Sequence, residues 1–303
     1  MTLLRSLGLR SRHFGILALS GGGGKTTALF ALAGELAARG ARVLVTTTTR
    51  IRDPRTEGRR IDGFLEIPDP AGALPGDASG LPSSGGGAES GADAAGGKGP
   101  AGRGSVTVLC AGVEDGKLVG VDPGAFPDLD ASGRWDAILA EADGAKMRPV
   151  KAPAPYEPVW PRGVSTVLGF LGLDCLDRPL DERVAHRPEI LGPLVGLPPG
   201  GILELGHLLR LVRHREGLFR GAPKEARRIL VLNKADLRPD LDPETLAAEA
   251  AAELAESGAS PPSDGESPAR IDRVLVCSLS DPDPARQVRA ARAVSGDGVP
   301  AVY

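Results

Sequence analysis

Aromatic side chains are scarce in this chain of 303 residues, where they make up 3% of the positions. The apolar core must therefore come mainly from Leu, Val, Ile and Ala, and a hydrophobic content of 41% is enough to build one. Cysteine is rare as well. Cys110, Cys175 and Cys277 are isolated, so they form neither a disulfide framework nor a C-x-x-C metal pair. We interpret all three as small core residues of a protein in a reducing compartment.

Long apolar runs and an excess of basic residues are also missing. No stretch approaches the roughly 18 apolar residues that a membrane helix requires. The short apolar run near the N-terminus leads into glycines rather than into a signal cleavage site. Lys and Arg (36) are outnumbered by Asp and Glu (39), and the net charge of -3 argues against a nucleic-acid binder. We therefore expect a cytoplasmic protein that binds neither nucleic acid nor a membrane.

Two low-complexity segments interrupt an otherwise globular pattern. Residues 72–104 contain runs such as PSSGGGAESGADAAGGKGPAG, and residues 256–270 read ESGASPPSDGESPAR. Neither has enough large apolar side chains to offset the entropy of ordering, so both are predicted to be disordered insertions. The remaining pattern predicts a single domain over residues 1–303.

Strand and helix patterns alternate along the rest of the chain. Apolar runs predict strands at residues 16–19, 43–45, 137–140, 166–171, 229–232 and 274–277, and helical patterns lie near 189–196, 202–215 and 243–255. A further helix should end at Gly40, which suits a C-cap. In VTVLCAGVEDGKLVGV, two apolar runs flank Asp115-Gly116, which predicts an accessory β-hairpin. The sequence thus predicts an α/β, three-layer fold of the P-loop NTPase type with a mainly parallel sheet.

A glycine loop joins the first predicted strand to the first predicted helix. It reads SGGGGKTT and departs from G-x-x-x-x-G-K-[ST], because Leu19 occupies the first glycine position and only a shortened G-x-x-G-K-T form remains. Backbone N–H groups of such a loop converge on an anion at the positive end of a helix. Lys25 would bridge the β- and γ-phosphates, and the Thr26 hydroxyl would bind Mg²⁺. The candidate phosphate-binding residues are Gly21, Gly22, Gly23, Gly24, Lys25, Thr26 and Thr27.

Acidic residues end a second apolar run, WDAILAEADG, at residues 135–144. A carboxylate in this position lies near Mg²⁺ in phosphate-loop enzymes. Glu141 and Asp143 would share one face of an extended strand because side chains alternate. Both are candidate Mg²⁺ ligands together with Thr26, and candidate catalytic residues together with Lys25. The pattern leaves open which acid faces the metal, and purely structural carboxylates are the alternative.

Hydroxyl and basic side chains follow the predicted strand at residues 43–45. One or more of residues 46–49, all threonine, could contact the γ-phosphate or Mg²⁺, because ligands bind at the carboxyl ends of strands in open α/β sheets. A β-branched strand end without such contacts is equally consistent with the pattern. Five arginines come next, and we interpret them as a solvated basic loop rather than a docking site for an anion: Arg50, Arg52, Arg55, Arg59 and Arg60.

The base-reading element of GTPases, N-K-x-D, follows another predicted strand as NKAD at residues 233–236. Asp236 would accept hydrogen bonds from the N1–H and 2-amino groups of guanine, while Asn233 and Lys234 would support the base and the loop. The serines that follow the strand at 274–277 resemble those that buttress the base. These residues favour GTP over ATP as the bound nucleotide.

Several charged residues have no role in this scheme. They follow the acidic strand or precede a predicted helix, and we regard them as candidate groups of a second site: Lys146, Arg148, Lys151, His186, Arg187 and Glu189. His207 and His214 are interpreted as surface residues of a helix. The sequence shows no Ser/His/Asp triad and no zinc-ligand spacing.

Six segments together resemble the selenium-dependent hydroxylase accessory proteins, the YqeC-like family: GGGGKTT, VLVTTTTRI, EADGAKMRPVKAP, EPVWP, GLDCLDRPLDERVAHRPE and LNKAD. The resemblance covers most of the chain apart from the low-complexity insertions. Its most specific part is EADGAKMRPVKAP with HRPE, since many NTPases share the other motifs. The resemblance implies an NTPase-like factor that serves the maturation of selenium-dependent molybdenum hydroxylases, with a molybdenum hydroxylase or its cofactor as partner.

Three functions are open on this basis. The first is a GTPase-like accessory protein that uses Mg²⁺-dependent hydrolysis to switch a docking surface or to deliver a cofactor. The second is an ATP-dependent ligase or kinase, because shortened loops also resemble those of Mur ligases, although NKAD argues against it. The third is a nucleotide-binding scaffold without turnover, since no residue is assigned as the base that activates water.

Overall fold

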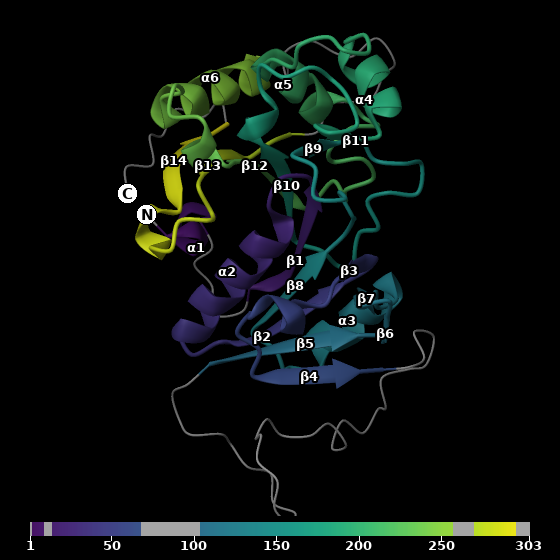
Figure 1. The fold of residues 1–303 in the computed structure, drawn as a ribbon. Helices are drawn as coiled ribbons and strands as arrows, with labels where there is room; N and C mark the ends of the chain where they lie inside the picture. Colours follow the sequence, from purple (N-terminus) through teal and green to yellow (C-terminus); the bar gives the residue numbers. More distant parts are fainter. Residues whose placement is uncertain (1, 9–13, 68–103, 257–269, 295–303) are drawn as a thin grey trace, which may run out of the picture.

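Nine strands form the central sheet of the protein, which a computed structural model describes over residues 2–8, 14–67, 104–256 and 270–294 (Figure 1). The order across the sheet is β14 (Val288–Ala293), β13 (Arg273–Cys277), β12 (Arg227–Asn233), β10 (Thr166–Gly172), β1 (Gly15–Gly21), β8 (Ala137–Glu141), β2 (Arg42–Thr47), β5 (Ser105–Cys110) and β4 (Gly63–Glu66). All neighbours are parallel except β13 and β14. The predicted mainly parallel sheet is confirmed.

Helices cover both faces of this sheet, because strand side chains alternate between two hydrophobic clusters. In β1, Leu17 and Leu19 face the cluster of α1 (Leu3–Ser6) and α2 (Lys25–Ala38), whereas Ile16 and Ala18 face the other. The second cluster includes buried residues of four helices: α3 (Phe126–Ala131), α4 (Pro188–Val195), α5 (Leu205–Arg213) and α6 (Pro243–Glu256). The three-layer α/β architecture is therefore confirmed.

Short elements complete the described structure. Gly40, with φ of 89°, follows the end of α2, as the sequence predicts. A two-stranded parallel sheet consists of β9 (Val150–Lys151) and β11 (Ala185–His186). Single 3-10 turns cover Pro54–Glu57, Pro123–Ala125, Leu173–Cys175, Ala235–Leu237 and Pro284–Arg286.

The predicted hairpin is present, but it is shorter than expected. β6 (Gly112–Glu114) and β7 (Lys117–Val119) are antiparallel, and the positive φ angles of Asp115 (49°) and Gly116 (69°) suit a tight two-residue turn. These strands form a separate sheet with β3 (Arg50–Arg52). The first apolar run was wrongly grouped with the hairpin. It forms β5 in the main sheet, because Val108 and Leu109 are both fully buried on opposite faces, which a half-exposed hairpin arm does not allow.

Several sequence predictions fall partly or wholly outside the described residues. The low-complexity segments at 72–104 and 256–270 do so almost entirely, and the single-domain organisation stays a prediction. Cys110, Cys175 and Cys277 are free and buried, which confirms them as core residues. Burial raises the pKa of the Cys175 thiol to about 12. Within the described ranges, no helix has both the length and the apolar character needed to cross a membrane.

The strand order reverses at β1, and this reversal indicates where a ligand would bind. β1 lies between β8 and β10, and the chain leaves β1 toward the β2 side before it returns and continues to the β10 side. Ligands of open α/β sheets bind beyond the carboxyl ends of the strands at such a reversal. The glycine loop begins at the end of β1, Glu141 ends β8, and NKAD begins with the last residue of β12. All three motifs therefore lie at the carboxyl ends of central strands (Figure 1).

Candidate functional site

The glycine loop is tightly packed between β1 and α2. Gly21, Gly23 and Gly24 have positive φ angles of 92°, 80° and 127°. Gly22 has no room for a side chain, because a Cβ atom there would lie 2.6 Å from the carbonyl oxygen of Arg148. Only glycine combines such backbone angles with such close approach. The run of four glycines is thus explained by the shape of the loop.

The backbone N–H groups of the loop divide into two sets. Gly21 donates to the Asp143 carboxylate at 3.2 Å, and Gly23 donates to Arg148 O at 3.0 Å, so these groups hold the loop in place. The Gly22 N–H also holds the loop in place, because it donates to Phe170 O of β10 at 2.9 Å. Gly24 is the N-cap of α2, and no side chain of the described residues caps this helix. The N–H groups at the first turn of α2 are therefore the donors suited to an anion.

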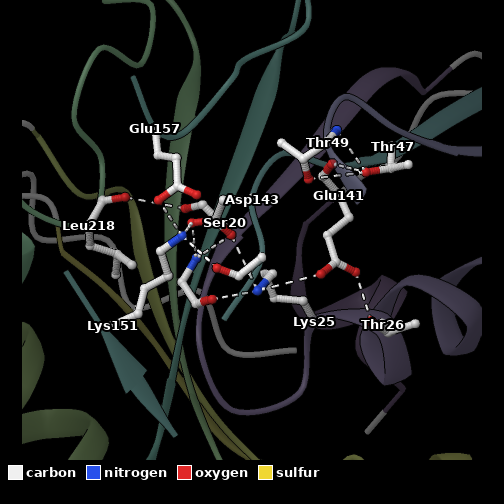
Figure 2. A network of polar contacts seen from close by, with 12 residues as sticks. Ser20, Lys25, Thr26, Thr47, Thr49, Glu141, Asp143, Lys151, Glu157 and Leu218 are labelled. Atoms are coloured by element: carbon white, nitrogen blue, oxygen red, sulfur yellow. Dashed lines mark hydrogen bonds and ion pairs between the residues drawn. The ribbon is translucent and has the colours of Figure 1, made fainter. Parts of the chain in front are cut away.

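Lys25 and Thr26 begin α2 beside the acid that ends β8 (Figure 2). Thr26 Oγ1 donates to Glu141 Oε2 at 2.7 Å. The Lys25 ammonium group lies 3.5 Å from Glu141 Oε1 and 3.3 Å from Asp143 Oδ1, and it also donates to Gly21 O. The structure thus brings an ammonium group, a hydroxyl and a carboxylate together at the positive end of a helix.

The two acids have different surroundings, although both contact Lys25. Asp143 is 1% exposed and accepts from the Gly21 N–H, and its Oδ2 lies 3.0 Å from Lys151 Nζ. Its carboxylate therefore holds the first residue of the glycine loop, Gly21, in place. Glu141 is 5% exposed and has the Thr26 hydroxyl as its close partner. Strand alternation alone predicts that Glu141 and Asp143 share one face, but their different partners show that they have different roles.

Burial and charge act against each other on these groups. Burial lowers the pKa of Lys25, but attraction to Asp143 and Glu141 outweighs it, so the pKa lies above the ordinary lysine value. Burial raises the pKa of Glu141, and Lys25 and Thr26 oppose that rise only in part. Lys25 is therefore fully charged at neutral pH. Glu141 would be stabilised in its ionised form by a further cation.

The threonines at the end of β2 and directly after it make structural hydrogen bonds. Thr46 Oγ1 donates to Leu109 O at 2.8 Å, and Thr47 Oγ1 donates to Glu141 O at 2.9 Å. Thr48 behaves in the same way, with a bond of 2.6 Å to Val159 O. Of the two interpretations left open, these contacts favour a strand end stabilised by its own hydroxyls. Each of the five arginines that follow pairs with a nearby acid: Arg50 with Glu114, Arg52 and Arg59 with Glu57, Arg55 with Asp53, and Arg60 with Asp62. The predicted loop is wrong for Arg50 and Arg52, which lie in β3, and for Arg55, which lies in a 3-10 turn.

NKAD lies beside the glycine loop. Asn233 is 4% exposed, its Nδ2 donates to Gly23 O at 2.8 Å, and its Oδ1 accepts from the Leu279 N–H at 3.1 Å. Asn233 thus connects the loop to the segment after β13. Asp236 is exposed, and the Ser280 hydroxyl donates to its Oδ2 at 3.2 Å. The structure therefore brings Asp236 and a serine of the next strand end together, as the sequence suggested.

Two acids near these motifs were not assigned from the sequence. Asp174 Oδ2 lies 2.7 Å from Lys234 Nζ. Glu157 Oε2 lies 2.8 Å from Lys151 Nζ and 2.6 Å from Arg187 Nη1. Glu157 belongs to the segment EPVWP. Its partner Lys151 belongs to the motif EADGAKMRPVKAP, and its partner Arg187 is 30 residues away, so the sequence does not show these contacts. Lys151 and Arg187, both candidates for a second site, are thereby joined through one carboxylate (Figure 2 shows Lys151 and Glu157).

Between pH 6.5 and about 4, the wild-type protein should lose more stability than His186→Gln. Burial, together with the positive charges of Arg187, Lys151 and Lys146, lowers the pKa of His186 to about 4, against the opposing charge of Glu157. An unfolded histidine titrates near pH ~6.5. The unfolded state thus binds more protons in this window, so the contribution of the neutral imidazole is complete above it and is lost as the pH falls. Urea unfolding of both proteins across this range measures the difference, and parallel pH profiles would contradict it.

Comparison with known proteins places the chain in a family. The model of the YqeC protein family matches residues 17–189. A protein of Escherichia coli (strain K12), described as "Uncharacterized protein YqeC", is 32% identical over 235 residues, which is 77% of this chain and 80% of the relative. The chain belongs to the YqeC family. The YqeC match includes the glycine loop, both acids of the site and His186-Arg187, whereas NKAD lies beyond the residues matched by the family model. No solved structure matches the chain.

Proposed function

We propose that this YqeC-family protein binds a nucleoside triphosphate together with Mg²⁺ and hydrolyses it. The observation that carries the proposal is the convergence of Lys25, Thr26 and Glu141 where β1 leads into α2. An ammonium group compensates the charge of a γ-phosphate, and a hydroxyl beside a carboxylate offers the oxygen ligands that Mg²⁺ prefers. The uncapped first turn of α2 adds backbone donors and the positive end of the helix dipole.

Glu141 is the proposed Mg²⁺ carboxylate, and Asp143 is not. Asp143 is already engaged by the Gly21 N–H and by two ammonium groups. Glu141 instead lies against the Thr26 hydroxyl, which is the other proposed ligand. The described part of the chain contains no cluster of three or more His, Cys, Asp or Glu suited to a metal. That finding fits Mg²⁺, which is commonly held by one or two protein oxygens together with phosphate oxygens and water.

In phosphoryl transfer the protein mainly positions groups and stabilises charge. Bound Mg²⁺ would supply Lewis-acid stabilisation of the phosphate oxygens. Lys25 would supply a fixed positive charge, and the N–H groups of residues 24–27 would orient the β-phosphate. Asp143 would hold Lys25 and Gly21 in place, so we assign it as a positioning residue.

Guanine is the proposed base. The hydrogen bond from Asn233 to Gly23 O, which holds the start of NKAD against the glycine loop, supports a position of the exposed Asp236 carboxylate near the proposed phosphate-binding groups. A carboxylate accepts two hydrogen bonds from guanine N1–H and the 2-amino group, whereas adenine offers no such donor pair. Ser280 supports Asp236 through its hydroxyl. These contacts favour a GTPase-like protein over an ATP-dependent ligase or kinase.

The proposed biological role is that of an accessory factor in the maturation of selenium-dependent molybdenum hydroxylases. Family membership, together with the resemblance carried by EADGAKMRPVKAP and HRPE, supports this role. The partner would be a molybdenum hydroxylase or its cofactor. Selenium-dependent hydroxylase activity should fall in cells that lack this protein and should return with the wild-type gene but not with Thr26→Ala. Unchanged activity in the deletion strain would contradict the role.

Glu141→Gln and Asp143→Asn should differ in their response to Mg²⁺. Charge-assisted contacts are worth about 1.5–3 kcal/mol, so loss of the metal carboxylate should weaken the stimulation of GTP binding by Mg²⁺ at least about tenfold. Asp143→Asn should retain that stimulation but lower the melting temperature, because Lys25 and Lys151 lose a buried partner. Nucleotide titrations with and without Mg²⁺, and thermal melts, separate the two. Equal Mg²⁺ dependence in both variants would move the metal site elsewhere.

A further inference from the structure

The segment between β8 and β9, residues 142–149, lies against the glycine loop and contains the cations Lys146 and Arg148. Its Arg148 carbonyl accepts from the Gly23 N–H at 3.0 Å, so the segment lies directly on the loop. Gly144 O accepts from Lys151 Nζ at 2.7 Å, and Lys151 in β9 is in register with His186 in β11. This segment and the end of β11 therefore lie together beside the proposed triphosphate site.

Cations outnumber carboxylates in this region. A continuous series of ion pairs runs from Glu141 through Lys25, Asp143 and Lys151 to Glu157 (Figure 2). Glu157 in turn pairs with Arg187. Lys146 is exposed and Arg148 is half-buried, and neither has a carboxylate partner in the described ranges. Lys25, Lys151 and Arg187 pair with the three carboxylates Glu141, Asp143 and Glu157, so Lys146 and Arg148 are the two cations of this region without a counterion in the described ranges.

The backbone is strained at the same place. Lys146 and Met147 have φ angles of 47° and 62°, and Arg187 has a φ of 66°. Residues other than glycine seldom adopt this region, and Pro188 further disfavours a helical backbone at the residue before it. Such positions cost about 1–3 kcal/mol each and cluster at ligand-binding sites. Strain therefore occurs in both segments that present the cations.

We propose that Lys146, His186 and Arg187 form a site for the phosphate group of a second substrate, next to the nucleotide. The position beside a triphosphate rests on the proposed function, whereas the capacity to bind phosphate does not. A phosphate monoester carries close to two negative charges at neutral pH. Lys146 has no carboxylate partner in the described ranges, and Arg187 shares Glu157 with Lys151, so the carboxylates leave an excess of positive charge at these residues. Lys146 and Arg187 provide charge, and the neutral imidazole of His186 provides one hydrogen-bond donor.

Titration of inorganic phosphate into protein saturated with Mg²⁺ and a non-hydrolysable GTP analogue tests this site, because the nucleotide fills the glycine loop. Calorimetry should show saturable binding to the wild-type protein. Lys146→Ala should weaken that binding at least about tenfold, as expected for the loss of a charge-assisted contact. Lys146→Arg should retain it. Lys224→Ala, which removes an exposed lysine elsewhere, is the matched control and should change nothing.

Absence of saturable phosphate binding, or equal binding to wild type and Lys146→Ala, overturns the proposal. If the protein binds no nucleotide, the proposed function fails but the second site is still tested by titrating phosphate into the free protein. Binding that is weakened by Lys146→Ala and not by Lys25→Arg then supports the site. Binding that is weakened only by Lys25→Arg places the ion in the glycine loop and overturns it. Circular dichroism confirms that each variant is folded.

Discussion

Replacing Lys151 with methionine should destabilise the protein by about 3–5 kcal/mol, because the buried Asp143 and the half-buried Glu157 would lose the cation that they share. Lys151 is 1% exposed, and its ammonium group lies 3.0 Å from Asp143 and 2.8 Å from Glu157. It also donates to Gly144 O. Methionine fills a similar volume but offers no charge and no donor. Urea unfolding monitored by circular dichroism measures the change in the free energy of unfolding.

Lys146→Met is the matched control for this experiment. Lys146 is exposed and has no ion pair in the described residues, so its replacement should change stability by no more than about 0.5 kcal/mol. The double variant Lys151→Met with Glu157→Gln should lose less stability than the sum of the two single substitutions, since both remove the same ion pair between Lys151 and Glu157. A loss of less than about 1 kcal/mol in Lys151→Met would contradict the ion-pair chain.

Lys25→Ala should weaken GTP binding at least about 30-fold, because loss of one partner of a buried charge pair costs about 2–5 kcal/mol. Lys25 is 4% exposed and lies between Glu141 and Asp143, so alanine should also lower stability. Lys25→Arg keeps a charge between these acids, yet its planar, branched head group cannot replace a compact ammonium group in a buried site. It should therefore also weaken binding while losing less stability.

Titration of a fluorescent GTP analogue, at a temperature where circular dichroism shows each variant to be folded, measures this effect. Lys224→Ala should bind as the wild type does, because Lys224 is exposed and belongs to none of the motifs of the site. Wild-type affinity in both Lys25 variants would remove the glycine loop from the nucleotide site.

Much of the fold can be predicted from the sequence because the central strands are uninterrupted apolar runs. β8, β10, β12 and β13 have such runs and lie where they were expected. β5 was assigned to the hairpin because its apolar run precedes Asp115-Gly116 closely, and sequence spacing does not show that both of its faces are covered. Pairing between distant strands decides that question, and it depends on the whole sheet.

The site could be predicted in its parts but not in its connections. The motifs around Lys25, Glu141 and Asn233 each follow a strand, which is enough to place them at one edge. The separate roles of Glu141 and Asp143 could not be predicted, because strand alternation gives both the same direction. Their difference comes from Thr26 on one side and from Lys151 on the other.

Competition binding of GTP, ATP and XTP to the wild type and to Asp236→Asn tests the central claim most directly. Each charged hydrogen bond from Asp236 to guanine is worth about 1.5–3 kcal/mol, so GTP should outcompete ATP at least about tenfold on the wild-type protein. Asp236→Asn replaces an acceptor oxygen with a donor NH₂, which suits the 2-oxygen of xanthine and not the 2-amino group of guanine. The variant should therefore lose GTP and gain XTP. A wild-type preference for ATP that is unchanged in Asp236→Asn would contradict the account and favour an ATP-dependent ligase or kinase.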